Sequence, residues 1–262
     1  MENTPKHSLG QHWLYDDISL EAMVHAAHIT KGDTLLEIGP GLGTLTAKLV
    51  AAADRVVAVE LDKELADSLP TRIAADNLQV LSEDILHFDL TRMPQGYKVV
   101  ANLPYYLTSH ILRLLCESKT SFSEAALLVQ KEVAERVCAQ PGGCSLLSIS
   151  VQFYTEASLG MIIPAELFTP PPKVDSRILA LRYLKKPRYP EVNTKLFFQI
   201  VKAGFSQRRK TVLNSLSAGL RLERKMTMEL LKRAGIYPGA RAQALSLDQW
   251  YELYKQIEAE HR

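Results

Sequence analysis

Hydrophobic and polar positions along the first 140 residues follow two alternating patterns. Short runs rich in valine, leucine and alanine predict buried β-strands over 34–38, 55–59, 79–81, 98–101 and 125–130. Between these runs, apolar residues recur at helical spacing over 42–52, 63–75, 109–118 and 131–138. Strands that alternate with helices predict an α/β fold with a doubly wound, mostly parallel sheet.

The pattern differs towards the two ends of the chain. Residues 18–29 predict a helix before the first strand, with Ser19 as its N-cap. A β-prone run spans 147–154, and a further strand is expected over 178–183. After the charged, proline-punctuated stretch at 185–190, the pattern is helical over 194–205, 209–220, 226–234 and 247–260. The sequence therefore predicts two domains, 1–184 and 185–262, of which the second is all-helical.

The charge changes sign at the same boundary. Residues 1–183 contain 15 Lys and Arg against 22 Asp and Glu, a net charge of −7. Residues 184–262 contain 16 against 7, a net charge of +9. A strongly basic C-terminal part favours a polyanionic partner, although a solvated lysine-rich surface would give the same count.

Composition excludes several classes of protein. The chain is 47% hydrophobic and 23% charged, as in an ordinary globular protein, and we expect neither a membrane span nor a signal peptide. Three cysteines without a CxxC spacing, and the lack of an HExxH motif, argue against a disulfide framework and a metal site. A reducing cytoplasm is the expected location.

The strand expected at 98–101 ends in Asn102-Leu103-Pro104-Tyr105. Pro104 stops the strand, so an amide, two carbonyls and an aromatic ring are placed at its carboxyl end. In an open α/β sheet, ligands bind at that edge. Hydrogen-bond acceptors beside a stacking surface suit a planar, amino-bearing substrate such as a nucleobase, whereas an ordinary Asn-x-Pro turn is the alternative.

A glycine-rich loop, Glu37-Ile38-Gly39-Pro40-Gly41-Leu42-Gly43, follows the first strand. Its ExGxGxG spacing differs from that of pyrophosphate binders, and it contains no basic residue, so a nucleoside ligand is favoured. Glu60 ends the second strand, where an acid typically binds ribose hydroxyls, and Asp84 follows the third, where it could accept from an adenine amino group. S-adenosylmethionine fits this set because it has a ribose, an adenine and no phosphates.

Several blocks of the chain resemble one known family, the ribosomal RNA adenine N6,N6-dimethyltransferases of the bacterial KsgA type. They are the glycine loop, the stretch 102–105, and three further blocks at 9–14, 168–176 and 205–216. The resemblance implies a Rossmann-like methyltransferase sheet and dimethylation of two adjacent adenosines in the 3′-terminal hairpin loop of small-subunit (16S) rRNA, during 30S biogenesis. It also implies a cytoplasmic, monomeric enzyme with S-adenosylmethionine as cofactor and no metal.

The resemblance also assigns roles to individual residues. The catalytic set comprises Asn102, Leu103, Pro104, Tyr105 and Phe168. The cofactor set comprises His12, Leu14, Gly39, Gly41, Glu60, Asp84 and Asn102, and His12 departs from the asparagine that many bacterial members carry. Tyr105 and Phe168 are candidate stacking faces for the target base, with a core position as the alternative for Phe168. Arg208, Arg209 and Lys210 are expected to contact RNA phosphates, with a solvated charged turn as the alternative.

Three other functions remain open at this point. A large-subunit rRNA methyltransferase of the erythromycin-resistance type would share the Asn-x-Pro-Tyr and proline-loop patterns. An RNA-binding or transcription-associated factor could use the same scaffold without catalysis. DNA adenine methyltransferases carry similar Asn/Asp-Pro-Pro-Tyr motifs, although Leu103 and the basic C-terminal part count against that class.

Overall fold

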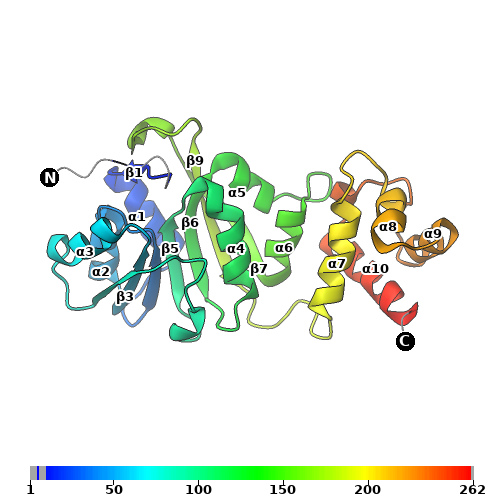
Figure 1. The fold of residues 1–262 in the computed structure, drawn as a ribbon, viewed down its shortest axis with the longest axis horizontal. Coiled ribbons are helices and arrows are strands. Elements are labelled where there is room, and N and C mark those ends of the chain that lie inside the picture. Colours follow the sequence, from blue (N-terminus) through cyan, green and yellow to red (C-terminus); the bar gives the residue numbers. More distant parts are fainter. Residues whose placement is uncertain (1–4, 6–9, 261–262) are drawn as a thin grey trace. The chain divides into compact units, whose positions relative to one another are not determined.

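The computed structural model describes residue 5 and residues 10–260, and its main feature is a seven-stranded sheet (Figure 1). The strand order is β4-β3-β2-β5-β6-β9-β7. The strands are β2 (Thr34–Ile38), β3 (Arg55–Glu60), β4 (Leu78–Ser82), β5 (Lys98–Asn102), β6 (Glu124–Gln130), β7 (Thr155–Ile163) and β9 (Ser176–Tyr183). Strands β2 to β6 run parallel, whereas β9 pairs antiparallel with β6 and with β7. The predicted α/β fold is confirmed.

The central strands β2, β3, β5 and β6 are buried along nearly their whole length and apolar in their middles, as in strands covered on both faces. The covering helices are α1 (Asp17–Ala26), α2 (Thr44–Ala52), α3 (Lys63–Arg72), α4 (Thr108–Glu117) and α5 (Lys131–Val137), and Figure 1 shows α4 in front of the sheet. In the register, Leu35 of β2 pairs with Val56 of β3 and with Lys98 of β5. The carboxyl ends of these strands therefore meet at one edge.

Helix α1 starts from a different cap than the sequence predicted. Asp16, in extended backbone, accepts a hydrogen bond from the Ser19 backbone N–H at 2.8 Å and one from the Ser19 hydroxyl. Ser19 is 1% exposed and lies inside the first turn. The prediction of Ser19 as N-cap is therefore wrong, because Asp16 occupies the capping position three residues earlier.

The strand expected over 147–154 is also wrong. These residues form helix α6 (Leu146–Tyr154), and strand β7 follows it directly. At the start of α6 the Ser148 N–H donates to the Ser145 hydroxyl at 3.1 Å, and the Ser145 N–H donates to the Ser148 hydroxyl at 2.6 Å. This reciprocal cap fixes a helix where a short apolar run alone fits either structure.

The chain divides into two compact units: residues 1–135 with 155–183, and residues 136–154 with 184–262. The second unit contains α6 together with α7 (Thr194–Phe205), α8 (Val212–Leu220), α9 (Arg224–Arg233) and α10 (Leu247–Glu260). Ile149 and Phe153 of α6 belong to the same buried cluster as Phe197, Leu216 and Trp250. Residues 136–154 thus group with the helical unit, whereas the boundaries predicted from the sequence, 1–184 and 185–262, place them with the first.

A two-stranded antiparallel ribbon lies beside the main sheet. Strand β1 (Trp13–Leu14) pairs with β8 (Phe168–Thr169), with Trp13 opposite Thr169 and Leu14 opposite Phe168. The ribbon joins the N-terminal segment to the proline-rich loop, two parts of the chain more than 150 residues apart. Among the described residues, no helix has both the length and the apolar character needed to cross a membrane.

Candidate active site

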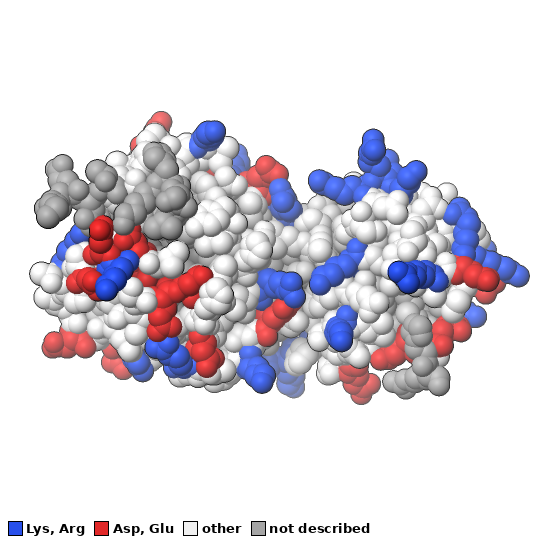
Figure 2. Space-filling view, viewed as in Figure 1, with Lys and Arg blue, Asp and Glu red and all other residues white. Residues whose placement is uncertain are grey.

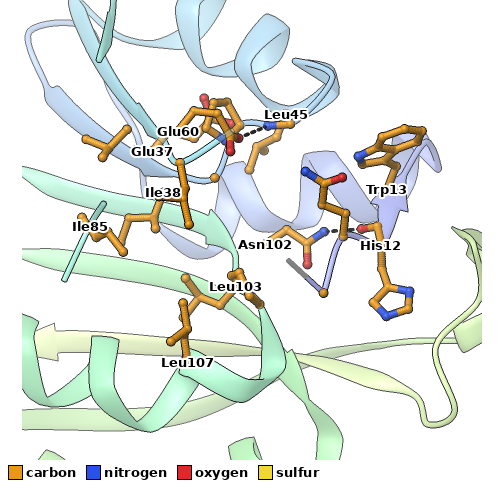
Figure 3. Close-up of a pocket in the computed structure, with 18 of the residues that line it drawn as sticks. His12, Trp13, Glu37, Ile38, Leu45, Glu60, Ile85, Asn102, Leu103 and Leu107 are labelled. Carbon is orange, nitrogen blue, oxygen red and sulfur yellow. Dashed lines mark hydrogen bonds between the residues drawn. The ribbon is translucent and has the colours of Figure 1, made fainter. Parts of the chain in front are cut away.

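A pocket opens at the carboxyl ends of β2, β3 and β5, between the glycine loop, the loop after β4 and the N-terminal segment (Figure 3). This is the edge of an open α/β sheet where ligands bind. Ten of the residues proposed from the sequence line it: His12, Leu14, Gly39, Gly41, Glu60, Asp84, Asn102, Leu103, Pro104 and Tyr105. Leu9, in one of the blocks that carry the family resemblance, is outside the described residues.

The glycine loop keeps backbone open to the pocket. Gly39 has a φ of 66° and Gly41 a φ of 59°, a left-handed conformation that glycine adopts without steric cost. No described atom lies within 4 Å of the position that a Cβ would take at Gly39, so a ligand can approach the backbone there. Gly43 has another purpose, because a Cβ there would lie 2.7 Å from Leu69 Cδ1 of α3.

Glu60 places a buried carboxylate at the end of β3 (Figure 3). Its Oε2 accepts from the Gly41 N–H at 3.0 Å, and its Oε1 accepts from the Asp62 N–H at 2.9 Å. The side chain is 6% exposed, and this burial raises the pKa of Glu60. Each oxygen retains further acceptor capacity, so Glu60 can bind the two hydroxyls of a ribose.

Glu37, at the end of β2, is a second buried acid behind the loop. It is 1% exposed, and neither carboxyl oxygen has a hydrogen-bond partner among the described residues. Burial raises the pKa of Glu37 to about 8; the nearby Thr46 hydroxyl opposes the shift, and the negative charge of Glu60 adds to it. At neutral pH Glu37 is therefore mostly protonated, and Glu60 is the acid that faces a ligand.

Asn102 is held by its amide nitrogen, which leaves its oxygen available. Its Nδ2 donates to the backbone carbonyl of His12 at 2.9 Å, and Figure 3 shows that carbonyl facing the Asn102 amide. The Oδ1 atom forms no hydrogen bond with any described residue. The side chain is only partly buried and lines the pocket. Asn102 thus presents a fixed acceptor at the end of β5.

The two carbonyls after Asn102 differ in their use within the chain. The Pro104 carbonyl accepts from the Leu107 N–H at 3.0 Å and from the Thr108 hydroxyl at 3.4 Å. The Leu103 carbonyl accepts no hydrogen bond from any described residue, although the Leu103 N–H is bound to the Leu128 carbonyl. Of the two carbonyls proposed as substrate acceptors, that of Leu103 is the free one.

Tyr105 is fixed at both ends of its side chain. Its hydroxyl shares a 2.6 Å hydrogen bond with the Ser176 hydroxyl at the start of β9. Its ring stacks on the His12 imidazole, with centroids 5.7 Å apart and planes at 19°. The Nδ1 of His12 in turn donates to the Pro170 carbonyl at 2.7 Å. The ring of His12 therefore supports Tyr105 and the proline loop, and Figure 3 shows it pointing away from Asn102.

Asp84 and Phe168 occupy less open positions. Asp84 lines the pocket, but its carboxylate also accepts from the Leu86 N–H at 2.9 Å and pairs with His87 at 2.9 Å. Phe168 is 2% exposed, does not line the pocket and packs in a buried cluster with Leu14. In this conformation its ring is a core aromatic, which was the alternative reading of the sequence, and it offers no open face to a base.

Sequence reasoning missed much of the pocket lining. Trp13, Ile38, Leu45, Val59, Ile85, Tyr106, Leu107 and Ile111 also line it. Four of these, Ile38, Leu45, Val59 and Ile111, are apolar residues within predicted strands and helices, where no local pattern distinguishes a pocket wall from a core. Tyr106 is the exception, since an aromatic residue directly after the Asn-Leu-Pro-Tyr stretch was visible in the sequence.

The cationic turn, residues 208–210, lies in the second unit between α7 and α8. Arg208, Arg209 and Lys210 are exposed, and none of them forms an ion pair with a residue that the structure describes. Figure 2 shows Lys and Arg side chains gathered over this connection. The structure therefore presents the three charges to solvent in a unit distinct from the pocket.

Nearly the whole chain matches the model of a protein family. Residues 2–259 fit the family described as ribosomal RNA adenine dimethylase. The chain belongs to this family. The ribosomal RNA small subunit methyltransferase A of Dehalococcoides mccartyi strain 195 is 41% identical, and the match covers 92% of this chain and 84% of that protein. The protein of the same name from Fusobacterium nucleatum is 38% identical, with coverage of 98% and 99%.

Two solved structures of other proteins share the fold. A dimethyladenosine transferase from Plasmodium falciparum superposes with a TM-score of 0.82 at 26% identity, covering 95% of this chain and 98% of that one. The 23S rRNA methyltransferase ErmE superposes with a TM-score of 0.75 at 27% identity, covering 94% and 99%. Both comparisons span the two units.

Family membership establishes an rRNA adenine methyltransferase that uses S-adenosylmethionine. The pocket fits this cofactor on three observations: a buried carboxylate at Glu60, open backbone at Gly39, and no lysine or arginine among the lining residues described. A cationic sulfonium without phosphates requires no basic residue. No group of three or more His, Cys, Asp or Glu within the described part of the chain could hold a metal ion.

Proposed function

We propose that the chain dimethylates N6 of two adjacent adenosines in the 3′-terminal hairpin loop of small-subunit rRNA, acting as a monomer in 30S biogenesis in the cytoplasm. The relatives that carry the small-subunit name support this substrate, since they are 38–41% identical over almost the whole chain. The observation that carries the mechanism is the pair of unused acceptors, Asn102 Oδ1 and the Leu103 carbonyl, at the end of β5.

These acceptors address the chemical difficulty of the reaction. The exocyclic amine of adenine is a poor nucleophile because its lone pair is delocalised into the ring. Hydrogen bonds from its two N–H groups to Asn102 and Leu103 would orient the lone pair out of the ring plane. When bound, S-adenosylmethionine supplies an electrophilic methyl group on a positively charged sulfur. Positioning of this kind can lower a barrier by about 7–11 kcal/mol.

The cofactor-binding roles follow from the positions of the side chains. Glu60 would accept hydrogen bonds from the ribose hydroxyls, Asp84 would accept from the adenine amino group, and the backbone of Gly39 and Gly41 would lie against the ligand. Leu14 contributes an apolar wall of the pocket. His12 would act through its neighbours, because its carbonyl holds Asn102 and its ring supports Tyr105.

The target adenosine has to leave its stack before it reaches these acceptors, which costs a few kcal/mol. The ring of Tyr105, braced by His12 and by its bond to Ser176, is the stacking surface that we propose for the flipped base. Stacking on an aromatic ring returns about 1–3 kcal/mol per base. The second transfer requires the same pocket to accept an amine that already carries one methyl group.

The second unit would dock the enzyme on the ribosome. Its net positive charge and the cationic turn at 208–210 support contacts with RNA phosphates, which position a protein without reading sequence. Transfer of labelled methyl groups to 30S particles that lack the mark tests the complete proposal. We expect labelled dimethyladenosine in the small-subunit RNA and none in protein-free large-subunit RNA or DNA. Labelling of the large-subunit RNA instead would transfer the assignment to the erythromycin-resistance type.

A further inference from the structure

The second unit exposes one aromatic ring that the proposed docking role leaves unexplained. Tyr237 is 77% exposed, more than any other large hydrophobic residue described in the chain. The other aromatic residues of this unit are mostly buried, including Phe197, Trp250 and Tyr254. A ring open to water at this level contributes little to the stability of the free protein, and it is available to a ligand.

The backbone that carries Tyr237 is a tight and well-bonded turn. The preceding Ile236 is 3% exposed, and its N–H donates to the Leu231 carbonyl at 2.8 Å, which closes the end of α9. The Ala240 N–H donates to the Tyr237 carbonyl at 2.9 Å. The ring rests on Gly239, where a Cβ would lie 2.5 Å from Tyr237 Cε1. One side of the ring thus lies against the Gly239 backbone, and most of the side chain is open to solvent.

This turn lies beside the cationic turn at 208–210. The Ala240 carbonyl accepts from the Val212 N–H at 2.7 Å, which ties the Tyr237 turn to the first residue of α8. Val212 is buried and follows Lys210 by two positions. The short bond and the burial fix the two turns to each other, so an exposed ring and three exposed, unpaired cations share one end of the helical unit.

We propose that Tyr237 is a stacking site for an unpaired nucleobase of the small-subunit rRNA, with the cationic turn binding the phosphates next to that base. Single-stranded RNA is bound by this combination, since bases stack on aromatic rings while basic side chains follow the backbone. Duplex RNA keeps its bases stacked inside the helix and would use the cations alone. The site deepens the docking role given under Proposed function and rests on it.

The test compares two RNAs bound by the full-length chain, a ten-nucleotide single strand and a duplex of the same length. We expect Tyr237→Ala to weaken binding of the single strand about 5- to 100-fold, the effect of losing one stacked base. Duplex affinity should stay within about twofold of wild type, because the cations remain. The slope of affinity against salt should not change for either RNA.

Two further variants separate stacking from other contacts. Tyr237→Phe should keep wild-type affinity for the single strand, since the ring alone is needed. Tyr237→Leu, which is apolar but cannot stack, should lose as much affinity as Tyr237→Ala. The exposure of the side chain means that all three variants should melt at the wild-type temperature. Wild-type affinity of Tyr237→Ala for the single strand, or an equal loss on both RNAs, would overturn the stacking site.

Failure of this inference can be told apart from failure of the function. If wild-type protein methylates unmarked 30S particles while Tyr237→Ala binds single strands normally, the stacking site is refuted and the enzyme assignment stands. If Tyr237→Ala loses single-strand affinity but wild type does not methylate those particles, the stacking site stands and the substrate is wrong.

Discussion

The two ends of strand β5 differ in whether their polar groups have hydrogen-bond partners within the chain. At its amino end, Lys98 is 8% exposed and its Nζ has three partners, the His28 carbonyl at 2.6 Å, Asp33 at 3.0 Å and Glu124 at 3.1 Å. At its carboxyl end, Asn102 keeps an acceptor that no described residue uses. The polar group at one end of this five-residue strand is fully partnered within the chain, whereas the one at the other end keeps an acceptor without a described partner.

The difference separates stability from function in this fold. At the amino edge, Lys98 forms ion pairs with carboxylates of the same chain. An unpaired buried charge there would cost stability. The carboxyl edge keeps free acceptors at Asn102 and Leu103 and an unpaired buried acid at Glu37. Polar groups without partners cost stability. We expect the substrate to supply partners for Asn102 and Leu103, whereas Glu37 lowers its cost by keeping its proton.

The largest expected effect breaks the comparison at its functional end. Asn102→Ala should lower the single-turnover rate of methyl transfer on unmarked 30S particles by about 10²–10³-fold, as loss of one oriented hydrogen-bond partner in a transition state typically does. RNA affinity should remain close to wild type, since the docking charges belong to the second unit. A rate within a few-fold of wild type would sink the proposed mechanism. Thermal melting of the variant controls for loosening of the His12 segment, which Asn102 also holds.

The next effect concerns the stability cost of the buried acid Glu37 at the carboxyl edge. Glu37 keeps its proton up to a pKa of about 8 in the fold, against 4.5 for an ordinary glutamate. The folded state therefore binds more protons than the unfolded state between these values, and stability falls as pH rises through that window. Glu37→Gln should remove this dependence, so its advantage over wild type should grow by about 3 kcal/mol from pH 5 to pH 7.5. Urea unfolding of the cofactor-free protein at both pH values measures it; parallel pH curves would contradict a buried, raised-pKa acid.

At the amino end of β5 we expect a loss of stability and no loss of binding. Lys98→Met removes the common partner of Asp33 and Glu124, whose side chains are each 21% exposed. Partial exposure moderates the penalty to about 2 kcal/mol of unfolding free energy, below the usual value for a fully buried pair. Calorimetric titration should give the wild-type affinity for S-adenosylmethionine. If Lys98→Met weakened S-adenosylmethionine binding and left the free energy of unfolding unchanged, the amino end of β5 would serve binding and the comparison would be wrong. The triple variant with Asp33→Asn and Glu124→Gln should recover part of the loss.

Two acids at the carboxyl edge sharpen the comparison further. Glu60→Ala and Asp84→Ala should weaken S-adenosylmethionine binding by about 1–3 kcal/mol. We expect the larger effect for Glu60, which is more buried, and the smaller for Asp84, which also has partners at Leu86 and His87. Titration calorimetry measures both, and Asp89→Ala, an exposed acid outside the pocket lining, is the control. Wild-type affinity in both variants would remove these acids from the site.

The smallest effect tests exposed charges that form no ion pair with any described residue. We replace Arg208, Arg209 and Lys210 together by glutamine and measure binding to 30S particles. The slope of log affinity against log salt concentration should become shallower by about two, since each phosphate contact contributes about 0.7–0.9. Affinity for the free cofactor should not change. A solvated turn without RNA contacts predicts an unchanged slope, and that result would retire the docking role of this turn.

Features set by local sequence could be predicted, whereas features set by residues distant in the chain could not. The glycine loop, Glu60, Asp84 and Asn102 were predictable because each follows a strand, and strand ends converge in any parallel sheet. The burial of Phe168 and the packing of residues 136–154 with the helical unit were not, since both depend on neighbours distant in the chain. The helix at 146–154 was misread because an apolar run has no decisive period, and a serine cap settled it.

The ribbon of β1 and β8 links the N-terminal segment, which contacts Asn102, to the proline-rich loop. Two residues per strand cannot hold a ribbon alone, so its persistence depends on Leu14 and Phe168 in the core beneath it. Opening the proline loop would break the bond from His12 to Pro170 and release the segment that orients Asn102. If the roles proposed above are right, cofactor contacts and base contacts share one local unfolding equilibrium, and we expect a ligand on either side to raise the protection of the other against hydrogen exchange.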